Sequence, residues 1–447
     1  MSAKAYRRLR TALVVVLVLA AFYVTYRYTL HRMVEAKLDE IRKQGYPVTL
    51  AELDKWYPQP PPGQNAADVY LEAFKLFAPK LASDTNLPVV GYAHLPARDT
   101  PFAPEMRQGI AEYLARNQQS LDLLHKAATM KFCRFPSEGP DVETMFESLM
   151  NRLNVTRTGT RMLLLDSLSA SAHGDAQRVV ESTTTSIALA ESVKAPPQLI
   201  SYLVETACFG ISIGGLEQAL SRTAFNDQQL VALTKAFHEV ETDEGFIGAI
   251  IGERARANWT WQEMRAGGGS VKDPIVYSDT TSSLDRAAAM IYGPLGFIDL
   301  DYLARLEFYD DLLRACDTTF PQRLETVGSL NHKRALFNVL PLAKIEAELT
   351  EKSVNREARL QAQLRAVRVA LSVERYRIAN GALPESLGAL VPKFLTAVPT
   401  DPFDGQPLRY KKLANGYVVY SIGEDGVDNG GTEGFCPGTD ITFIVER

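Results

Sequence analysis

The chain has few of the residues that build metal or redox centres. It holds four cysteines and six histidines in 447 residues, and none of them shows a zinc-binding or CxxC spacing. In an oxidising compartment the cysteines could form up to two disulfides, whose connectivity cannot be deduced from spacing. Cys208 lies in an apolar run and is predicted to be a buried thiol. The other cysteines are Cys133, Cys316 and Cys436.

Catalytic motifs are missing as well. The sequence contains no HExxH, no GxSxG and no phosphate-binding glycine loop. His125 and His173 lie on predicted helices near polar residues, where a histidine is usually a surface or hydrogen-bonded side chain. We therefore expect no enzyme, although an enzymatic or ligand-binding helical domain stays open as the alternative.

An excess of positive charge is also absent. The formal net charge is −5, with 23% charged and 46% apolar residues. This composition describes a folded, mildly acidic protein and disfavours nucleic acid as a partner.

A long apolar run stands near the N-terminus. Residues 12–26 read ALVVVLVLAAFYVTY, with four basic residues before the run and Arg27 after it. A bilayer core needs ~20 apolar residues, and interfacial tyrosines and arginines can extend the span. The run predicts a single-pass anchor of the cytoplasmic membrane over residues 12–28, with a cytoplasmic N-terminus and an extracytoplasmic bulk. The alternative is a signal peptide cleaved near residues 18–20.

The apolar periodicity continues beyond this run. Leu30, Val34, Leu38 and Ile41 recur at helical spacing until Gly45 and Pro47 interrupt the pattern. Anchor and stalk are therefore predicted to be one helix.

Proline-rich sequence follows the stalk. Thr49 and Glu52 have the spacing of a capping box at the start of a short helix, which Pro58 ends. The run PQPPPGQN is typical of a stiff, extended spacer before the next domain.

Helical patterns dominate from Asn65 to about Leu324 and predict an all-helical bundle or short solenoid. An αα-hairpin is expected around Gly174, and the loop 266–283 interrupts the helices. The predicted helices of this region are 142–173, 176–193, 198–220 and 228–241. The predicted caps are Asn65, Asp141, Asp175 and Asp227.

One cluster in this region combines charge and aromatic rings. Its members are Glu253, Arg254, Arg256, Trp259 and Trp261. Such residues suit a binding surface. Two tryptophans spaced by two cannot share one helical face, however, so a helix with buried indoles is the preferred interpretation.

The last quarter of the chain has its own order of elements. Leu360, Leu364, Val367, Leu371 and Ile378 predict one helix face, which ends at Gly381. A DPF turn, the strand pattern NGYVVYSIG and the acidic loop GEDGVDNGG follow.

This order resembles the globular head of the major pseudopilin of bacterial type II secretion, a type IV pilin-like protein. The segment FNVLPLAKIEAEL, with Pro341 at its junction, is similar to the middle of a pilin helix. The N-terminal processing signature of that family is absent, so we expect no prepilin-type cleavage. The resemblance implies a small α+β module, docking to secretion-system or other envelope proteins, and a calcium site.

The resemblance places the calcium ligands at Asp425, Asp440 and, less directly, Asp428. Calcium prefers carboxylate and carbonyl oxygens on a tightly curved loop. Five glycines can supply that curvature through positive φ. They are Gly423, Gly426, Gly430, Gly431 and Gly434.

Taken together, the sequence predicts a mainly α protein in four segments: anchor and stalk (1–45), short helix and linker (46–64), helical domain (65–330) and pseudopilin-like module (331–447). The expected function is that of a membrane-anchored, extracytoplasmic structural or assembly protein.

Overall fold

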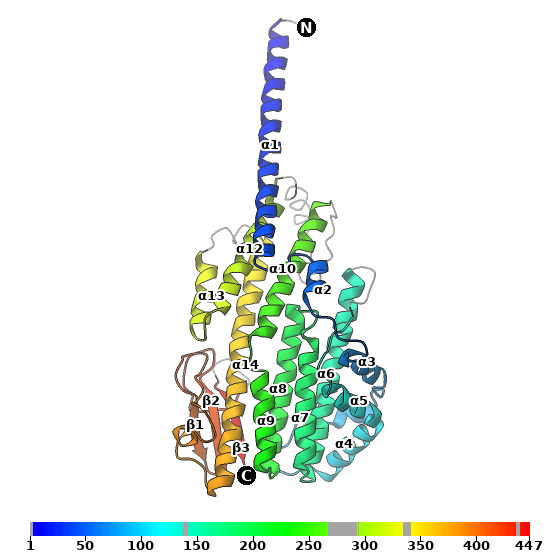
Figure 1. The fold of residues 1–447 in the computed structure, drawn as a ribbon, viewed down its shortest axis with the longest axis vertical. Coiled ribbons are helices and arrows are strands. Elements are labelled where there is room, and N and C mark those ends of the chain that lie inside the picture. The colour runs from blue at the N-terminus through cyan, green and yellow to red at the C-terminus, as the bar shows by residue number, and fades with distance from the viewer. Residues whose placement is uncertain (1–2, 137–141, 267–292, 294, 334–340, 435–438) are drawn as a thin grey trace. The chain divides into compact units, whose positions relative to one another are not determined.

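The computed structural model describes residues 3–136, 142–266, 293, 295–333, 341–434 and 439–447. The described chain is mainly helical, with one small sheet near the C-terminus (Figure 1). Two compact units form, each from three stretches of sequence. Unit 1 contains Met1–Trp56, Ile251–Arg314 and Ser329–Thr350, and unit 2 contains Tyr57–Ile250, Ala315–Gly328 and Glu351–Arg447. This grouping differs from the four segments expected from the sequence, whose boundaries stay predictions.

Unit 1 contains the N-terminal helix α1 (Ala3–Lys43) and the short helix α2 (Leu50–Trp56). Most of α10 (Glu244–Arg265), most of α12 (Phe297–Cys316), the end of α13 (Gln322–Lys333) and the start of α14 (Pro341–Asn380) also belong to it. The helix α14 therefore starts at the predicted junction, Pro341.

The stalk prediction is confirmed. Leu30, Val34, Leu38 and Ile41 are all buried, at 5% exposure or less. Helix α1 ends at Lys43, and Gly45 follows with a φ of 86°. The capping role of Thr49 is also confirmed, because its hydroxyl accepts a hydrogen bond from the amide of Glu52 at 3.1 Å.

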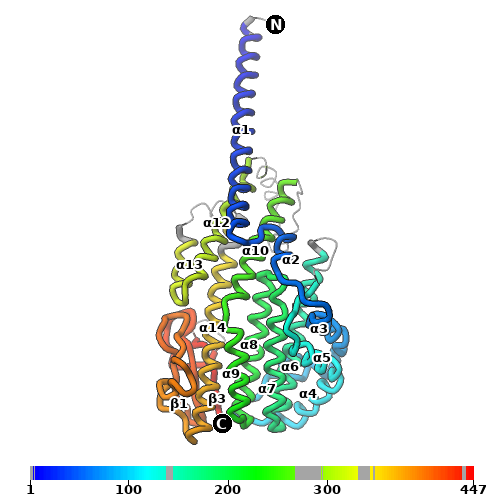
Figure 2. Tube along the Cα trace, viewed as in Figure 1, coloured from blue at the N-terminus to red at the C-terminus, as the bar shows by residue number. Residues whose placement is uncertain are grey.

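Ion pairs hold the stalk to α12. The Lys37 ammonium lies 2.6 Å from Asp310, and the Arg27 guanidinium lies 3.1 Å from Asp299. By contrast, the apolar part of α1 is fully exposed, and Figure 2 shows it running past the rest of unit 1. By length and composition this helix can cross a membrane, a property that signal sequences share.

The body of unit 2 is an antiparallel helical layer. Helices α6 (Val142–Ala172), α7 (Ala176–Glu191) and α8 (Leu199–Arg222) pack on one another, and α9 (Asp227–Glu239) packs on α7 (Figure 1). The smaller helices α3 (Ala66–Lys75), α4 (Pro104–Arg116) and α5 (Gln118–Ala128) lie beside α6. Helix α8 is apolar enough to span a membrane, but it is a largely buried core helix.

Two of the four predicted helix caps are confirmed. The predicted αα-hairpin is confirmed by α6 and α7, with Gly174 at a φ of 74° between them. Asn65 and Asp175 are N-caps as expected. The cap predicted at Asp227 is wrong by one residue, because Asn226 caps α9 and forms a capping box with Gln229. Asp141 and all but the first residue of the predicted loop 266–283 lie outside the described residues.

The C-terminal sheet has three antiparallel strands in the order β1 (Arg409–Leu413), β2 (Gly416–Ser421) and β3 (Ile441–Glu446). The predicted helix end is confirmed, since α14 stops at Asn380 and Gly381 has a φ of 72°. Four of the five predicted face residues are buried, but Ile378 is 46% exposed and does not belong to the face.

The sheet and the helical layer share one hydrophobic core. Leu364, Val367 and Leu371 of α14 belong to the same buried cluster as Tyr417 and Phe443 of the sheet. The cluster also includes residues of α8 and α9, among them Phe209, Leu216, Leu233 and Phe237. The part of the predicted module from Glu351 to Arg447 is therefore an integral part of unit 2.

Side chains of α8 also bind the outer edge of β3. The Glu217 carboxylate accepts a hydrogen bond from the amide of Ile444 at 2.6 Å, and the Ser221 hydroxyl accepts one from the amide of Glu446 at 3.2 Å. The edge strand is thus covered by a helix.

A buried aspartate holds the DPF turn. Asp401 is fully buried and accepts four hydrogen bonds, from the amides of Phe403 (3.0 Å) and Ile422 (3.0 Å), the Ser421 hydroxyl (2.8 Å) and the Arg409 guanidinium (2.7 Å). This side chain joins the turn to β1 and to the end of β2.

Candidate functional site

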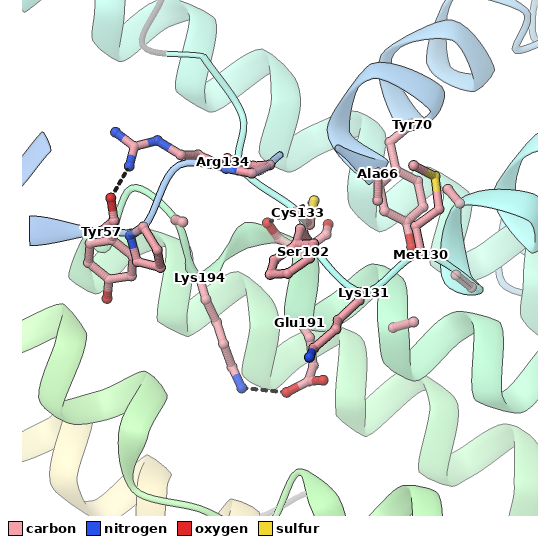
Figure 3. Close-up of a pocket in the computed structure, with 17 residues that line it drawn as sticks. Tyr57, Ala66, Tyr70, Met130, Lys131, Cys133, Arg134, Glu191, Ser192 and Lys194 are labelled. Atoms are coloured by element: carbon pink, nitrogen blue, oxygen red, sulfur yellow. Dashed lines mark hydrogen bonds and ion pairs between the residues drawn. The ribbon is translucent and has the colours of Figure 1, made fainter. Parts of the chain in front are cut away.

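A pocket of about 430 Å³ opens in unit 2 where four segments meet (Figure 3). The segments are the proline-rich linker, the start of α3, the loop after α5 and the end of α7 with the short 3₁₀ helix η2 (Ser192–Lys194). The lining residues are Tyr57, Pro58, Pro60, Ala66, Tyr70, Ala127, Ala128, Met130, Lys131, Phe132, Cys133, Arg134, Ala188, Glu191, Ser192, Lys194 and Ala195. The linker is therefore a wall of the pocket.

The asparagine that caps α3 also fixes the wall formed by the loop after α5. The Asn65 carboxamide accepts a hydrogen bond from the amide of Arg134 and donates one to its carbonyl, both at 2.9 Å. The amide of Ala66 donates to the carbonyl of Phe132 at 2.7 Å. The Arg134 guanidinium in turn donates to the carbonyl of Tyr57 at 2.6 Å, which ties the linker to this loop. The backbone of two walls is therefore preorganised.

The space exists because short side chains line it. Five of the lining residues are alanines and two are prolines. Aromatic rings of Tyr57, Tyr70 and Phe132 form the larger apolar surfaces. In Figure 3, Tyr70 and Met130 lie at one side, whereas Lys131 points toward Glu191 and Lys194 at the other. The pocket thus has an apolar side and a charged side.

The charged side is built on Lys194. Its ammonium lies 2.5 Å from Glu191 and 3.5 Å from Glu205, a carboxyl of α8 that is only 3% exposed. Burial opposes the ammonium, but the charges of Glu205 and Glu191 raise the pKa of Lys194. Lys194 therefore stays protonated at neutral pH.

Glu205 has the most perturbed carboxyl at this site. Burial raises the pKa of Glu205 to about 8, against the opposing attraction of Lys194. Its Oε2 is buried without a hydrogen-bond partner in the structure. At pH 7 the Glu205 carboxyl is therefore neutral in most molecules, and it does not cancel the charge of Lys194.

This carboxyl predicts a pH dependence of stability. The folded-state pKa of Glu205 lies above the ordinary value of 4.5, so its contribution is complete below pH 4.5 and is lost as pH rises through about 8. Across this window, ionisation of Glu205 should lower the free energy of unfolding by at most about 1.4 kcal/mol per pH unit. We therefore expect the melting temperature of the protein to fall as the pH rises.

The measurement is a series of thermal melts from pH 5 to pH 8.5. Glu205→Gln should flatten the slope, whereas Glu181→Gln, at an exposed position on α7, should leave it unchanged. An unaltered slope in Glu205→Gln would rule out this carboxyl as the source.

The nucleophiles at the pocket are not activated. Burial raises the pKa of the Cys133 thiol to about 12, so the thiolate is not populated at neutral pH. The Ser192 hydroxyl donates to the carbonyl of Leu189 at 2.7 Å. Among the described residues, neither group is hydrogen-bonded to a base of the kind that covalent catalysis uses; the Cys133 thiol lies 3.9 Å from the carbonyl of Ser192.

The two histidines considered from the sequence lie elsewhere. Nδ1 of His125 is 2.8 Å from the hydroxyl of Thr185, and Nε2 is 3.8 Å from Asp166. Thr185 is buried, which keeps a substrate away from this group. His173 contacts the carbonyl of Ser169 at 2.8 Å on an exposed helix end. His125 thus contacts α7, whereas His173 bonds only to the backbone of its own helix among the described residues.

The tryptophan cluster of α10 is internal to unit 1. Trp261 is 4% exposed and its indole N–H donates to Asp299 at 2.9 Å. Arg254 is fully buried and pairs with Asp310 at 3.0 Å. The preferred interpretation, a helix with a buried indole, is supported, and a binding surface at these residues is not.

The three predicted calcium ligands bind the backbone of their own loop. Asp440 is buried and accepts from the amides of Asn429 (3.2 Å) and Gly431 (2.7 Å), and Asp425 accepts from that of Val427 (3.1 Å). Asp428 accepts from the Tyr420 hydroxyl at 3.2 Å and from the amide of Gly430 at 2.9 Å. Among the residues that the structure describes, no three acidic, histidine or cysteine side chains are grouped as metal ligands.

This loop has the curvature expected of it. Gly423, Gly426, Gly430 and Gly431 have positive φ, while Gly434 does not. Residues 435–438, which precede Asp440, lie outside the described residues and include Cys436. The carboxylates as placed do not form a donor set for calcium, so the site stays a prediction.

Cys133, Cys208 and Cys316 are free thiols, and Cys208 is buried as predicted. Sequence reasoning did not find the pocket, since its charged residues carry no motif. The proline-rich linker, the cap at Asn65 and the break VKAPP after α7 are local signals near it, but none of them indicates a cavity. No protein-family model, curated protein or solved structure matches this chain.

Proposed function

We propose that the protein is a membrane-anchored, extracytoplasmic structural or assembly protein with a pseudopilin-like C-terminal module. The observation that carries the proposal is the division of α1 into two parts. Its apolar segment is completely exposed, while the stalk of the same helix is buried in unit 1. A helix of this kind can hold a folded body close to a bilayer.

The C-terminal elements support the second half of the proposal. A long helix that ends at Gly381, the Asp401 turn, an antiparallel sheet and an acidic loop follow one another in the order that suggested a pseudopilin-like head. On this basis the partners are secretion-system or other envelope proteins, reached from the extracytoplasmic side of the membrane.

A topology test examines the anchor. Four basic residues before the apolar run, Lys4, Arg7, Arg8 and Arg10, should keep the N-terminus in the cytoplasm and place Arg447 outside it. A reporter enzyme that works only outside the cytoplasm should therefore be active when it is fused after Arg447, and one that works only in the cytoplasm should be inactive. Replacing these four residues by glutamine should reduce or invert this orientation. The matched control replaces Lys352, Arg356 and Arg359 of α14, which are remote from the run in sequence.

Intact-mass measurement of the protein recovered from membranes separates anchor from signal peptide. If the helix is an uncleaved anchor, the measured mass should be that of the full 447-residue chain. A shorter product that begins near residue 21, or a reporter that works in the cytoplasm, would contradict the anchored topology.

We further propose calcium as a ligand of the loop that carries Asp425, Asp428 and Asp440. The support is the positive φ of four glycines, which gives the loop the tight curvature that a calcium-binding loop needs. Excess calcium should raise the melting temperature of the full chain relative to chelator, because a ligand that binds only the folded state stabilises it. Asp425→Asn should weaken this response, with Asp122→Asn on α5 as control. Equal melting with calcium and chelator would remove the site.

A second candidate function is ligand binding by unit 2, and the pocket favours it. Its volume lies within the range of roughly 300–1,000 Å³ that small-molecule sites occupy. Apolar walls with a few converging charges are the usual composition of such sites. An anchored protein can have this function as well.

A further inference from the structure

We propose that the pocket between the linker, α3, α5 and α7 binds a small organic anion with an aromatic or aliphatic body. This inference builds on the ligand-binding candidate and does not depend on the membrane anchor. It rests on the charge of the lining, the division between apolar and charged sides, and the shape of the walls.

The sign of the ligand's charge follows from the lining. The lining contains three cations, Lys131, Arg134 and Lys194, and one carboxylate, Glu191, and the Arg134 guanidinium is bound to the carbonyl of Tyr57. Glu191 is already paired with Lys194 at 2.5 Å. Lys131 is exposed, lies over the Phe132 ring at 5.5 Å, and makes no ion pair with any residue in the described part of the chain. An anionic head group would find its partner at Lys131.

The body of the ligand follows from the other side of the pocket. Of the aromatic rings in the lining, those of Tyr57 and Phe132 are half-buried and accessible. Tyr70 is 1% exposed and stacks on Phe74, with ring centroids 6.2 Å apart, so its ring holds a fixed position in the wall. Alanines 66, 127, 128 and 188 leave room beside that ring. A flat ring or a short aliphatic chain fills such a space without displacing a side chain.

The walls hold this shape without a ligand. Asn65 fixes the loop of Arg134 by two hydrogen bonds, and the Arg134 guanidinium fixes the carbonyl of Tyr57. Binding therefore costs little reorganisation of the backbone. Lys194 is a poor target for mutation, since its loss would leave Glu191 and Glu205 without their cation. Lys131 is the residue to test.

The experiment titrates the full chain in lipid nanodiscs by isothermal calorimetry with two matched probes, 2-naphthoate and its uncharged analogue 2-naphthamide. We expect 2-naphthoate to bind about fivefold more tightly, a preference of the size that one partly exposed charge supplies. Lys131→Met should remove the preference and leave the binding of 2-naphthamide unchanged. A parallel titration with 2-naphthyl phosphate identifies which anionic head group is preferred.

Two further variants make the test specific. Ala128→Leu should weaken both probes at least tenfold by filling the pocket, and Ala188→Leu, on α7, does the same if the first variant does not fold. Lys126→Met removes an exposed lysine of α5 outside the lining and should change neither affinity. The proposal would be overturned if 2-naphthoate did not bind, or if Lys126→Met lost the preference for 2-naphthoate as fully as Lys131→Met. Undiminished binding to a folded Ala128→Leu protein would also overturn it.

Discussion

Replacing Asp401 by alanine is expected to lower the free energy of unfolding of unit 2 by about 3–5 kcal/mol, the cost of breaking a buried ion pair. The substitution leaves the buried amide of Ile422 and the Ser421 hydroxyl without their acceptor. It also removes one partner of the Arg409 guanidinium. Urea unfolding, followed by the near-UV signal of the sheet tyrosines, measures the effect.

The matched control is Asp404→Ala. Asp404 also pairs with Arg409, but its side chain is 26% exposed and its carboxylate accepts a hydrogen bond from the amide of Gln406 within the turn. We expect a loss below about 1 kcal/mol, as for other exposed ion pairs. Equal losses in the two variants would mean that burial of Asp401 does not determine the stability of the turn.

The isolated segment 351–447 is expected not to fold. Leu364, Val367 and Leu371 of α14 share their buried cluster with α8 and α9, so excision exposes part of it to water. Each large apolar side chain brought into water costs roughly 1.5–3 kcal/mol. A few such losses reach the ~5–15 kcal/mol that stabilise a typical domain.

Circular dichroism and amide dispersion in NMR spectra test this expectation, with the full chain as reference. In the full chain, Leu216→Asp on α8 should shift the sheet amides of β3, whereas Val231→Asp, at an exposed position on α9, should not. A cooperative melt of the isolated segment would show that the sheet and α14 are self-sufficient.

Sequence periodicity was most informative where one helix meets one core. The stalk could be predicted because Leu30, Val34, Leu38 and Ile41 follow the helical repeat on a continuous segment. The same rule failed at Ile378, since that residue lies at the end of α14, where the repeat continues but no core surface faces it. Apolar periodicity predicts which residues share one face of a helix, but it does not predict how far along the helix a packing partner covers that face.

The pocket could not be predicted for a different reason. Pro58, Ala66, Lys131 and Lys194 are distant in sequence, and only tertiary packing brings them to one cavity. The perturbation of Glu205 likewise depends on burial, because in sequence it is an ordinary polar residue of an apolar helix. The cap at Asn226 was missed by one residue because Asn226 and Asp227 both have side chains that can cap a helix. The structure shows that Asn226 is the cap, since it forms the capping box with Gln229.

The hydrogen bonds from β3 to α8 have a consequence for polymerisation. A chain that tried to extend the sheet by adding a strand at β3 would find the amides of Ile444 and Glu446 already bound by Glu217 and Ser221. A filament or oligomer therefore cannot grow by adding a strand at the β3 edge while α8 stays in place.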